Sequence, residues 1–248
     1  GWLNHPVDAN KEALDERLEA MWKQIALKFR DYDDRLLFAG TNEVNNDDAD
    51  GAQPTEENYR VQNGFNQVFV NTVRATGGRN HYRHLIVQAY NTDVAKAVAH
   101  FTMPLDIVQN RIFLECHYYD PYDFTIMPND EDFKSQWGAA FAGGDVSSTG
   151  QEADIEATLG SLNVFINDNV PVIIGEYGPT LRDQLTGEAL ENHLKSRNDY
   201  IEYVVKTCVK NKLVPLYWDA GYTEKLFDRT TGQPHNAASI AAIMEGLN

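Results

Sequence analysis

The chain alternates amphipathic helical segments with short apolar runs, and this alternation constrains its fold more than any other feature. The first helical segment runs from Asp8 to about Arg30, where apolar residues recur at steps of three and four. The apolar run Leu36–Gly40 follows it. The same two patterns recur to the end of the chain, which predicts five strands and six helices, beginning with a helix.

The remaining expected strands lie near residues 85–88, 111–116, 172–175 and 214–218, and the longer helices near residues 55–76, 151–167, 188–210 and 236–247. The segment from Tyr118 to about Gly150 has the Gly, Asp, Ser and aromatic content of a surface excursion. Continuous apolar strands that alternate with helices indicate a parallel sheet covered on both faces. We therefore expect an α/β fold of the (β/α)8 TIM-barrel type, although five strands cannot close such a barrel alone.

An open doubly wound sheet is the alternative architecture. No Gly-rich phosphate loop follows the first expected strand, so nothing in the sequence favours that alternative. We expect residues 1–248 to form one domain, since α/β barrels of this length commonly remain undivided.

The charge balance bears on the partners of the chain. Lys and Arg together number 21 against 37 Asp and Glu, which gives a net charge of −16. A chain this acidic repels phosphate backbones and anionic lipid surfaces, so we expect neither nucleic acid nor membrane as a partner. No signal peptide is visible, and the first residues resemble the middle of a loop, so we expect an amino-terminal portion to be missing. Cys116 and Cys208 lie in an expected strand and an expected helix, which predicts buried free thiols.

Polar residues follow the expected strands at the point where each strand ends. In parallel α/β folds ligands bind at the carboxyl ends of the strands, so these residues are the candidates for chemistry. Glu43 and Glu176 each stand at such an end. Two carboxylates whose pKa values are driven apart can serve as an acid and a nucleophile in glycoside hydrolysis, with retention when they lie roughly 5–5.5 Å apart and inversion when the gap is wider. Taken singly, either glutamate could equally be a surface or ion-paired carboxylate.

Four strand ends carry motifs in a fixed order: Asn42-Glu43, His117-x-Tyr119, Gly175-Glu176-Tyr177-Gly178 and Tyr217-Trp218-Asp219. In this order and spacing the chain resembles glycoside hydrolase family five, in clan A. Three stretches, Ala89–Thr92, Glu176–Gly178 and Leu226–Arg229, are similar to the endoglucanase and xyloglucanase branch of that family, which occurs in gut and rumen bacteria. The resemblance extends over essentially the whole chain.

The resemblance implies a role for each of the two glutamates and their neighbours. Glu43 would be the acid/base at the end of barrel strand four, and Glu176 the nucleophile at the end of strand seven. Asn42 would hydrogen-bond the 2-hydroxyl of the sugar that is attacked. Tyr119 would hydrogen-bond the nucleophile, and His117 would lie against the acid/base and the substrate.

Two tryptophans are further candidates for contact with sugar. The resemblance implies that Trp218 forms the stacking floor beside the scissile bond, although in isolation this side chain could simply plug the barrel mouth. Trp2 would follow a His pair that lines the site in the family, which makes it a candidate substrate-binding residue. The chain would then supply about strands four to eight of the barrel.

The sequence departs from the family in two respects. The usual Asn-Glu-Pro is here Asn42-Glu43-Val44, which removes a rigid backbone device but no functional group, so we expect a local change in the loop. The first three barrel strands, with an Arg and paired His residues of the site, do not occur in this sequence. We expect a second chain, a swapped copy or another segment to supply them.

The resulting hypothesis is a retaining endo-β-1,4-glucanase that acts on cellulose-type β-glucan, with xyloglucan as one substrate, and that needs no cofactor. The resemblance implies a secreted or cell-surface enzyme. The alternative is an inactive barrel fragment or a carbohydrate-binding protein. A metal hydrolase is disfavoured because none of the 7 His residues has the spacing of a metal site, such as His-Glu-x-x-His or His-x-His.

Overall fold

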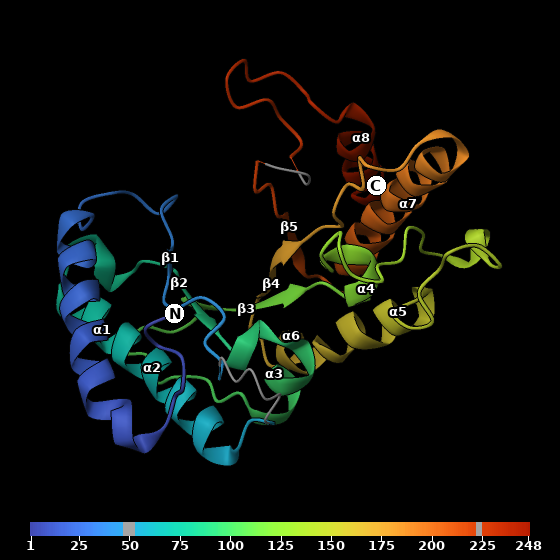
Figure 1. Cartoon of the computed structure of the whole chain (residues 1–248). Helices are drawn as coiled ribbons and strands as arrows, with labels where there is room; N and C mark the ends of the chain where they lie inside the picture. The colour runs from blue at the N-terminus through green and yellow to red at the C-terminus, as the bar shows by residue number, and fades with distance from the viewer. Residues whose placement is uncertain (47–52, 222–224) are drawn as a thin grey trace. The chain divides into compact units, whose positions relative to one another are not determined.

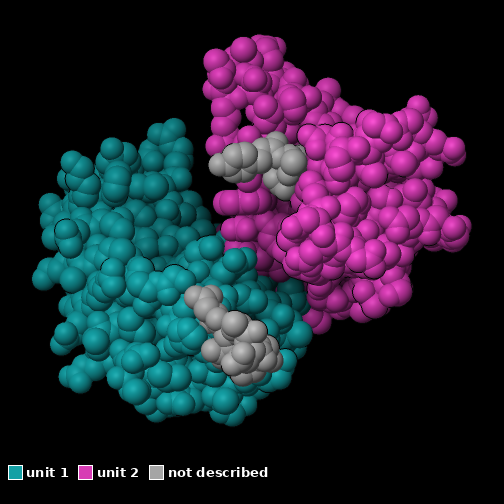
Figure 2. Space-filling model, in the orientation of Figure 1, with its two compact units in different colours: residues 1–116, 164–172 teal, residues 117–163, 173–248 magenta. Residues whose placement is uncertain are grey.

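The structure is a computed structural model, and it describes residues 1–46, 53–221 and 225–248 (Figure 1). The chain divides into two compact units, coloured separately in Figure 2. Unit 1 consists of residues 1–116 and 164–172, and unit 2 of residues 117–163 and 173–248.

The described residues form five strands and eight α-helices, together with three short 3₁₀ helices. The strands are β1 (Phe38–Ala39), β2 (Leu85–Gln88), β3 (Ile112–Tyr118), β4 (Val172–Tyr177) and β5 (Val214–Tyr217). The α-helices are α1 (Asp8–Lys28), α2 (Glu56–Ala75), α3 (Val94–His100), α4 (Tyr122–Thr125), α5 (Glu152–Ser161), α6 (Asn163–Asn167), α7 (Gly187–Lys210) and α8 (Ala237–Gly246). The 3₁₀ helices are η1 (Gly78–His81), η2 (Tyr90–Thr92) and η3 (Ala139–Phe141).

The strands follow one another in the sheet in chain order, β1-β2-β3-β4-β5, and the pairs β1–β2, β2–β3 and β4–β5 are parallel. This confirms the expected α/β fold, a parallel sheet of the kind found in part of a (β/α)8 barrel. Two expectations were less accurate. The helix predicted over residues 151–167 is divided into α5 and α6 at Leu162, and the predicted excursion after β3 contains α4 and η3.

The core of unit 1 is built where α1 and α2 pack against each other and against β1. The Trp22 ring lies 5.5 Å from Phe38 and 4.5 Å from Phe69, measured between centroids, and its indole N–H donates to the carbonyl oxygen of Gly40 at 2.9 Å. A Cβ on Gly40 would approach the Phe69 ring to 2.7 Å, so only glycine allows this close packing. The end of β1 is thereby fixed to both helices just before the first strand-end motif.

Unit 2 is organised around α7, which packs against α8, α5 and β5. A Cβ on Gly246 would meet the carbonyl oxygen of Glu202 and the Val205 side chain, both at 2.7 Å, which explains the close approach of α8 to α7. The Tyr200 ring is buried edge-on between Phe124 and Trp137, with centroids 5.5 and 5.2 Å away. These contacts tie the segment after β3 to the helix.

The strand β5 contradicts the expectation that every strand is buried on both faces. Its residues alternate in exposure, and Val214, Leu216 and Trp218, which share one face, are 47%, 48% and 45% exposed. An apolar run read from sequence cannot distinguish a strand covered on both faces from one that is covered on only one.

Two further findings concern the cysteines and the helices of the described residues. Both cysteines are free and buried, as predicted from their positions in a strand and a helix. Burial raises the pKa of the Cys208 thiol to about 12 and that of Cys116 still further. Of the helices among the described residues, none has the length and apolar character needed to cross a membrane.

Candidate active site

Glu176 lies near the end of β4 at an irregularity in the ladder with β5. Ile174 pairs with Pro215 and Tyr177 pairs with Tyr217, so β4 has one residue more than β5 between these two pairs. An extra residue of this kind is a β-bulge, which redirects side chains and is frequent beside functional sites. The Glu176 side chain is 15% exposed.

Two side chains from the end of β3 approach the Glu176 carboxylate within unit 2. The Tyr119 hydroxyl donates a hydrogen bond to Glu176 Oε2 at 2.9 Å. His117 Nδ1 lies 3.6 Å from the same oxygen, beyond hydrogen-bond range but close enough for an ion pair when the ring is protonated. His117 and Tyr119 are two residues apart, so they lie on the same face of the extended chain. A hydrogen bond to the ionised form of a carboxyl group stabilises that form, as a nucleophile requires.

Glu43 lies in unit 1, just after the end of β1, in an unusual backbone conformation. Its φ is +48°, in the left-handed region of backbone conformation that residues other than glycine rarely adopt. Residues with this conformation are enriched at functional sites. Its backbone N–H donates to Gln88 Oε1 at 3.2 Å, and Gln88 Nε2 donates to Glu115 Oε2 at 3.0 Å. Gln88 is buried at the end of β2, and its own carbonyl oxygen accepts from Gln62 and Asn66 of α2. A continuous chain of hydrogen bonds therefore connects α2 to the backbone of Glu43.

The segment after Glu43 is fixed by hydrogen bonds where the family pattern has a proline. Val44 is buried, and its carbonyl oxygen accepts from the Asn91 N–H at 2.9 Å. Asn45 Nδ2 donates to the Glu43 carbonyl oxygen and to Asn91 Oδ1, both at 2.9 Å. The Asn46 N–H donates to the Tyr90 hydroxyl at 2.6 Å. These bonds hold residues 44–46 against η2 and constrain the backbone where a proline ring would otherwise do so.

The other candidate substrate contacts are divided between the two units. Asn42 is exposed beside Glu43 in unit 1. Trp2, also in unit 1, packs against the core and carries the Arg17 guanidinium over its ring at 4.4 Å, which covers one of its faces. Trp218 lies at the end of β5 in unit 2, 45% exposed, with its backbone N–H donating to the Tyr177 carbonyl oxygen at 2.9 Å. An indole ring exposed this way offers an apolar face for stacking.

Asp219 follows Trp218 and accepts hydrogen bonds from two described residues after β5. Its two carboxylate oxygens accept from the backbone N–H groups of Gly221 and Leu226, at 2.9 and 3.0 Å. Burial opposes ionisation of Asp219, but the backbone hydrogen bonds and the nearby Arg229 outweigh it and lower the pKa of this carboxyl group. Asp219 therefore holds the backbone groups of Gly221 and Leu226 next to the end of β5.

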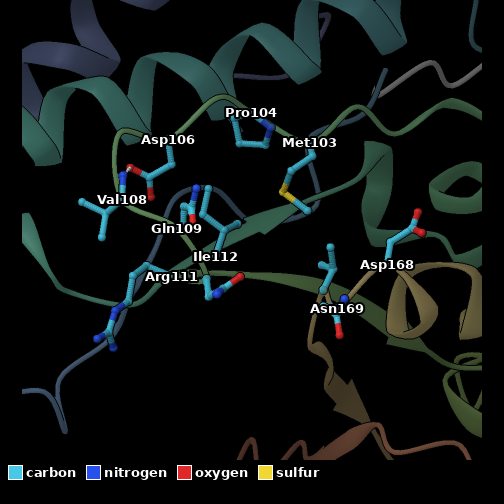
Figure 3. A pocket seen from close by; sticks show the side chains of 11 residues that line it. Met103, Pro104, Asp106, Val108, Gln109, Arg111, Ile112, Asp168 and Asn169 are labelled. Carbon is cyan, nitrogen blue, oxygen red and sulfur yellow. Dashed lines mark hydrogen bonds between the residues drawn. The ribbon is translucent and has the colours of Figure 1, made fainter.

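A hollow of about 260 Å³ lies in unit 1, and Figure 3 shows the residues that line it. It is lined by residues that precede β3 and β4, among them Arg111, Asp168 and Asn169. In parallel strands these are the amino ends, whereas Glu43 follows the carboxyl end of β1. Asp106, one of the lining residues, forms an ion pair with Arg74 at 2.7 Å and accepts a hydrogen bond from the Val108 N–H. The hollow therefore does not belong to the candidate site.

Comparison with known proteins decides the family. The family model described as cellulase (glycosyl hydrolase family 5) matches residues 1–224. The chain belongs to glycosyl hydrolase family 5. Among curated relatives of this family 5 chain, a xyloglucan-specific endo-β-1,4-glucanase of Bacteroides ovatus is 97% identical over 248 residues, which is 100% of this chain and 49% of the relative. Endoglucanase A of Paenibacillus barcinonensis is 33% identical over 99% of this chain and 63% of its own length.

Solved structures agree with this assignment. A Bacteroides ovatus family 5 xyloglucanase in complex with an XXXG heptasaccharide matches with a TM-score of 0.99 and 97% identity, over 100% of this chain and 54% of that one. A family 5 xyloglucanase from Paenibacillus pabuli in complex with ligand matches with a TM-score of 0.91 and 34% identity, over 100% of this chain and 71% of that one. The family 5 chain thus spans about half the length of the Bacteroides ovatus relative.

Sequence reasoning named the strand-end residues but missed those that hold them. Gln88 appeared only as part of an expected strand, and its signal was a polar residue at the end of an apolar run. The bulge at Glu176 had no signal that we recognise in the sequence. Its presence depends on the ladder between β4 and β5, which is a tertiary feature.

Proposed function

We propose that this chain carries the catalytic residues of a retaining endo-β-1,4-glucanase that hydrolyses β-glucan, with xyloglucan as its preferred substrate. The observation that carries the proposal is the hydrogen bond from Tyr119 to Glu176 at the end of β4, in a chain of glycosyl hydrolase family 5. A carboxylate held ionised and aimed by a phenol is suited to attack an electrophilic carbon. The choice of xyloglucan is supported by the names of the Bacteroides ovatus relatives, a xyloglucan-specific endo-β-1,4-glucanase and a xyloglucanase.

The proposed reaction has two steps. Glu176 attacks the anomeric carbon and forms a covalent glycosyl ester, while Glu43 protonates the departing glycosidic oxygen. Glu43, now a carboxylate, then takes a proton from water, and the resulting hydroxide attacks the same carbon and releases Glu176. Two inversions at the anomeric carbon give net retention. The left-handed backbone conformation of Glu43 and the hydrogen bond from its N–H to Gln88 support a catalytic role for this residue.

The remaining strand-end residues would bind the sugar. Asn42 would hydrogen-bond the 2-hydroxyl, His117 would lie against the substrate, and Trp218 would stack on a sugar face. Trp2 would contribute through the ring face that Arg17 leaves uncovered. The proposed chemistry requires no cofactor. Because a polysaccharide is too large to enter a cell intact, we propose that the enzyme works outside the cell or at its surface.

A complete barrel requires strands beyond the five of this sheet. A (β/α)8 barrel has eight strands, and in the five-stranded order β1 and β5 stand at the two edges. The exposed apolar residues of β5 are consistent with a surface that other barrel elements would cover. We propose that another segment or a second chain supplies them, and that activity requires this completion.

The test uses a completed barrel, defined as the Bacteroides ovatus relative in which this chain replaces its 97% identical counterpart. We expect it to hydrolyse xyloglucan, with the β-anomer appearing first by proton NMR. Glu43→Gln and Glu176→Gln should each reduce kcat by roughly a thousandfold or more. An inverted first product, or undiminished activity of Glu176→Gln, would overturn the proposal. Binding of xyloglucan without hydrolysis by the completed barrel would favour the carbohydrate-binding alternative.

A further inference from the structure

The helix α7 presents a row of polar side chains to the interior of unit 2. His193, Ser196, Arg197 and Tyr200 are all fully buried and recur at steps of three and four, so they share one face of the helix. A helix face packed in a core is ordinarily apolar, because burying a polar group is costly unless it is hydrogen-bonded. These four residues therefore need an explanation that core packing does not provide.

Each polar side chain of the row bonds to the backbone of a segment that follows β3 or β4. His193 Nδ1 lies 2.8 Å from the Ser135 carbonyl oxygen, and His193 Nε2 accepts from the Arg182 N–H at 3.0 Å. The Ser196 hydroxyl donates to the Trp137 carbonyl oxygen at 2.8 Å and accepts from the Trp137 N–H. The row thus fixes the backbone of the segments that follow β3 and β4.

Of the four residues in the row, Tyr200 bonds nearest in the chain to Tyr119, the residue that donates to Glu176. Its hydroxyl donates to the Asp120 carbonyl oxygen at 2.9 Å, and Asp120 directly follows Tyr119. Burial raises the pKa of Tyr200 well above its usual range, so the hydroxyl stays protonated and remains a donor. The Thr125 hydroxyl donates to the Tyr119 carbonyl oxygen. The backbone of Tyr119 is therefore fixed at two adjacent carbonyl groups.

Arg197 fixes the segment after the nucleophile. Its Nε donates to the carbonyl oxygen of Pro179, three residues beyond Glu176, at 2.9 Å. Its Nη2 donates to the Tyr217 hydroxyl at 2.6 Å, and the Tyr217 ring packs edge-on against Tyr177, with centroids 5.6 Å apart. The same helix face therefore holds both partners of the bond between Tyr119 and Glu176.

We propose that α7 is the positioning element of the active site and that Tyr200 is a positioning residue, which aligns Tyr119 on Glu176 through the Asp120 carbonyl group. This inference rests on the proposed function, because it assigns the alignment a catalytic consequence. A hydrogen bond to a carboxylate is strong only at the correct distance and angle. Loss of the Tyr200 hydroxyl weakens the bond to Glu176, lowers kcat and moves the acidic limb of the pH–activity profile upward.

The experiment compares Tyr200→Phe with Tyr203→Phe in the completed barrel. Tyr203 lies on the same helix, and its hydroxyl donates to Glu156 at the surface at 3.1 Å, so the control removes one hydrogen bond outside the row. For Tyr200→Phe we expect a loss of roughly fivefold to tenfold in kcat with KM nearly unchanged. The acidic limb of kcat/KM should move to higher pH. For Tyr203→Phe we expect wild-type kinetics.

The outcome of this comparison separates positioning from stability. Arg197→Lys is made in parallel and changes the bond to the segment after Glu176. If Tyr200→Phe does not fold, the kcat and pH profile of Arg197→Lys still test the positioning role of α7. An unmoved pH profile in the folded variants, with activity reduced only by the unfolded fraction, would overturn the inference. If Glu176→Gln is inactive and Tyr200→Phe is unchanged, only the positioning role fails. If Glu176→Gln remains active, the proposed function itself fails.

Discussion

The Tyr119 hydroxyl lies 2.9 Å from Glu176 Oε2 and donates a hydrogen bond to it. The donor follows β3 and the acceptor lies in β4, so the bond joins residues 57 positions apart in the chain. His117, which precedes Tyr119 by two residues, brings a ring nitrogen to 3.6 Å from the same oxygen. Two groups from one strand end thus converge on one carboxylate oxygen, which is the arrangement expected around an anionic nucleophile.

Tyr119→Phe should reveal the contribution of this hydrogen bond. The change removes a donor to the ionised carboxylate, so the pKa of Glu176 should rise. Since Glu176 must be ionised to act as the proposed nucleophile, a higher pKa moves the acidic limb of kcat/KM to higher pH. We expect kcat to fall by roughly tenfold to a hundredfold, measured on xyloglucan with the completed barrel. An acidic limb that stays in place would show that the bond does not tune the carboxylate.

Gln88→Leu should disturb the support beneath Glu43. Gln88 Oε1 accepts from the Glu43 N–H, and leucine of similar size removes that acceptor inside a buried site. We expect a loss of about 1–3 kcal/mol in the free energy of unfolding and a lower kcat. Gln24→Leu is the matched control, because Gln24 is exposed on α1 and bonds only within its helix, to the Ala20 carbonyl oxygen at 3.0 Å. Equal effects of the two substitutions would contradict the account.

His193 should make the protein sensitive to acid. Burial lowers the pKa of His193 to about 4 from an ordinary value of 6.5. Between these values the unfolded chain binds a proton that the folded chain does not, so stability falls as pH drops through this window. The loss is on the order of 3 kcal/mol by pH 4. His193→Gln should flatten this part of the curve of unfolding free energy against pH, measured by urea denaturation, and an unchanged slope would exclude His193 as its source.

Arg83 should be among the strongest structural determinants of unit 1. Its buried guanidinium donates to Asn80 Oδ1 and to the carbonyl oxygens of Phe29, Tyr32, Asp33 and Leu36. Lysine cannot satisfy this planar set, so Arg83→Lys should cost about 3 kcal/mol in unfolding free energy. Arg35→Lys is the control, since the Arg35 side chain is 88% exposed and bonds only to the neighbouring Asp33. A loss no larger than that of the control would contradict this role.

The fold could be predicted because its signals are local. Short apolar runs between helical segments located the five strands, and the polar residues that follow these runs made Glu43 and Glu176 the candidates for chemistry. The residues behind them could not be predicted in the same way. Tyr200 and Arg197 read as members of an amphipathic helix, and only the folded chain shows that their polar atoms reach the backbone at Asp120 and Pro179.

The exposure of the β5 side chains also could not be predicted from the sequence. The run Val214–Trp218 has the composition of a fully buried strand, yet alternate residues of β5 are exposed. Whether an apolar face is covered depends on neighbours distant in sequence. The bulge at Glu176 is of the same kind, because it exists only in the pairing of β4 with β5.

The most direct test of the central claim is to identify the residue that becomes covalently attached to sugar. The completed barrel is incubated with an activated 2-deoxy-2-fluoro cello-oligosaccharide, which slows breakdown of the glycosyl ester, and the labelled peptide is sequenced by mass spectrometry. The account predicts one equivalent of sugar on Glu176, and none in Glu176→Gln. Label on Glu43, or steady turnover of substrate with no trapped ester, would contradict it.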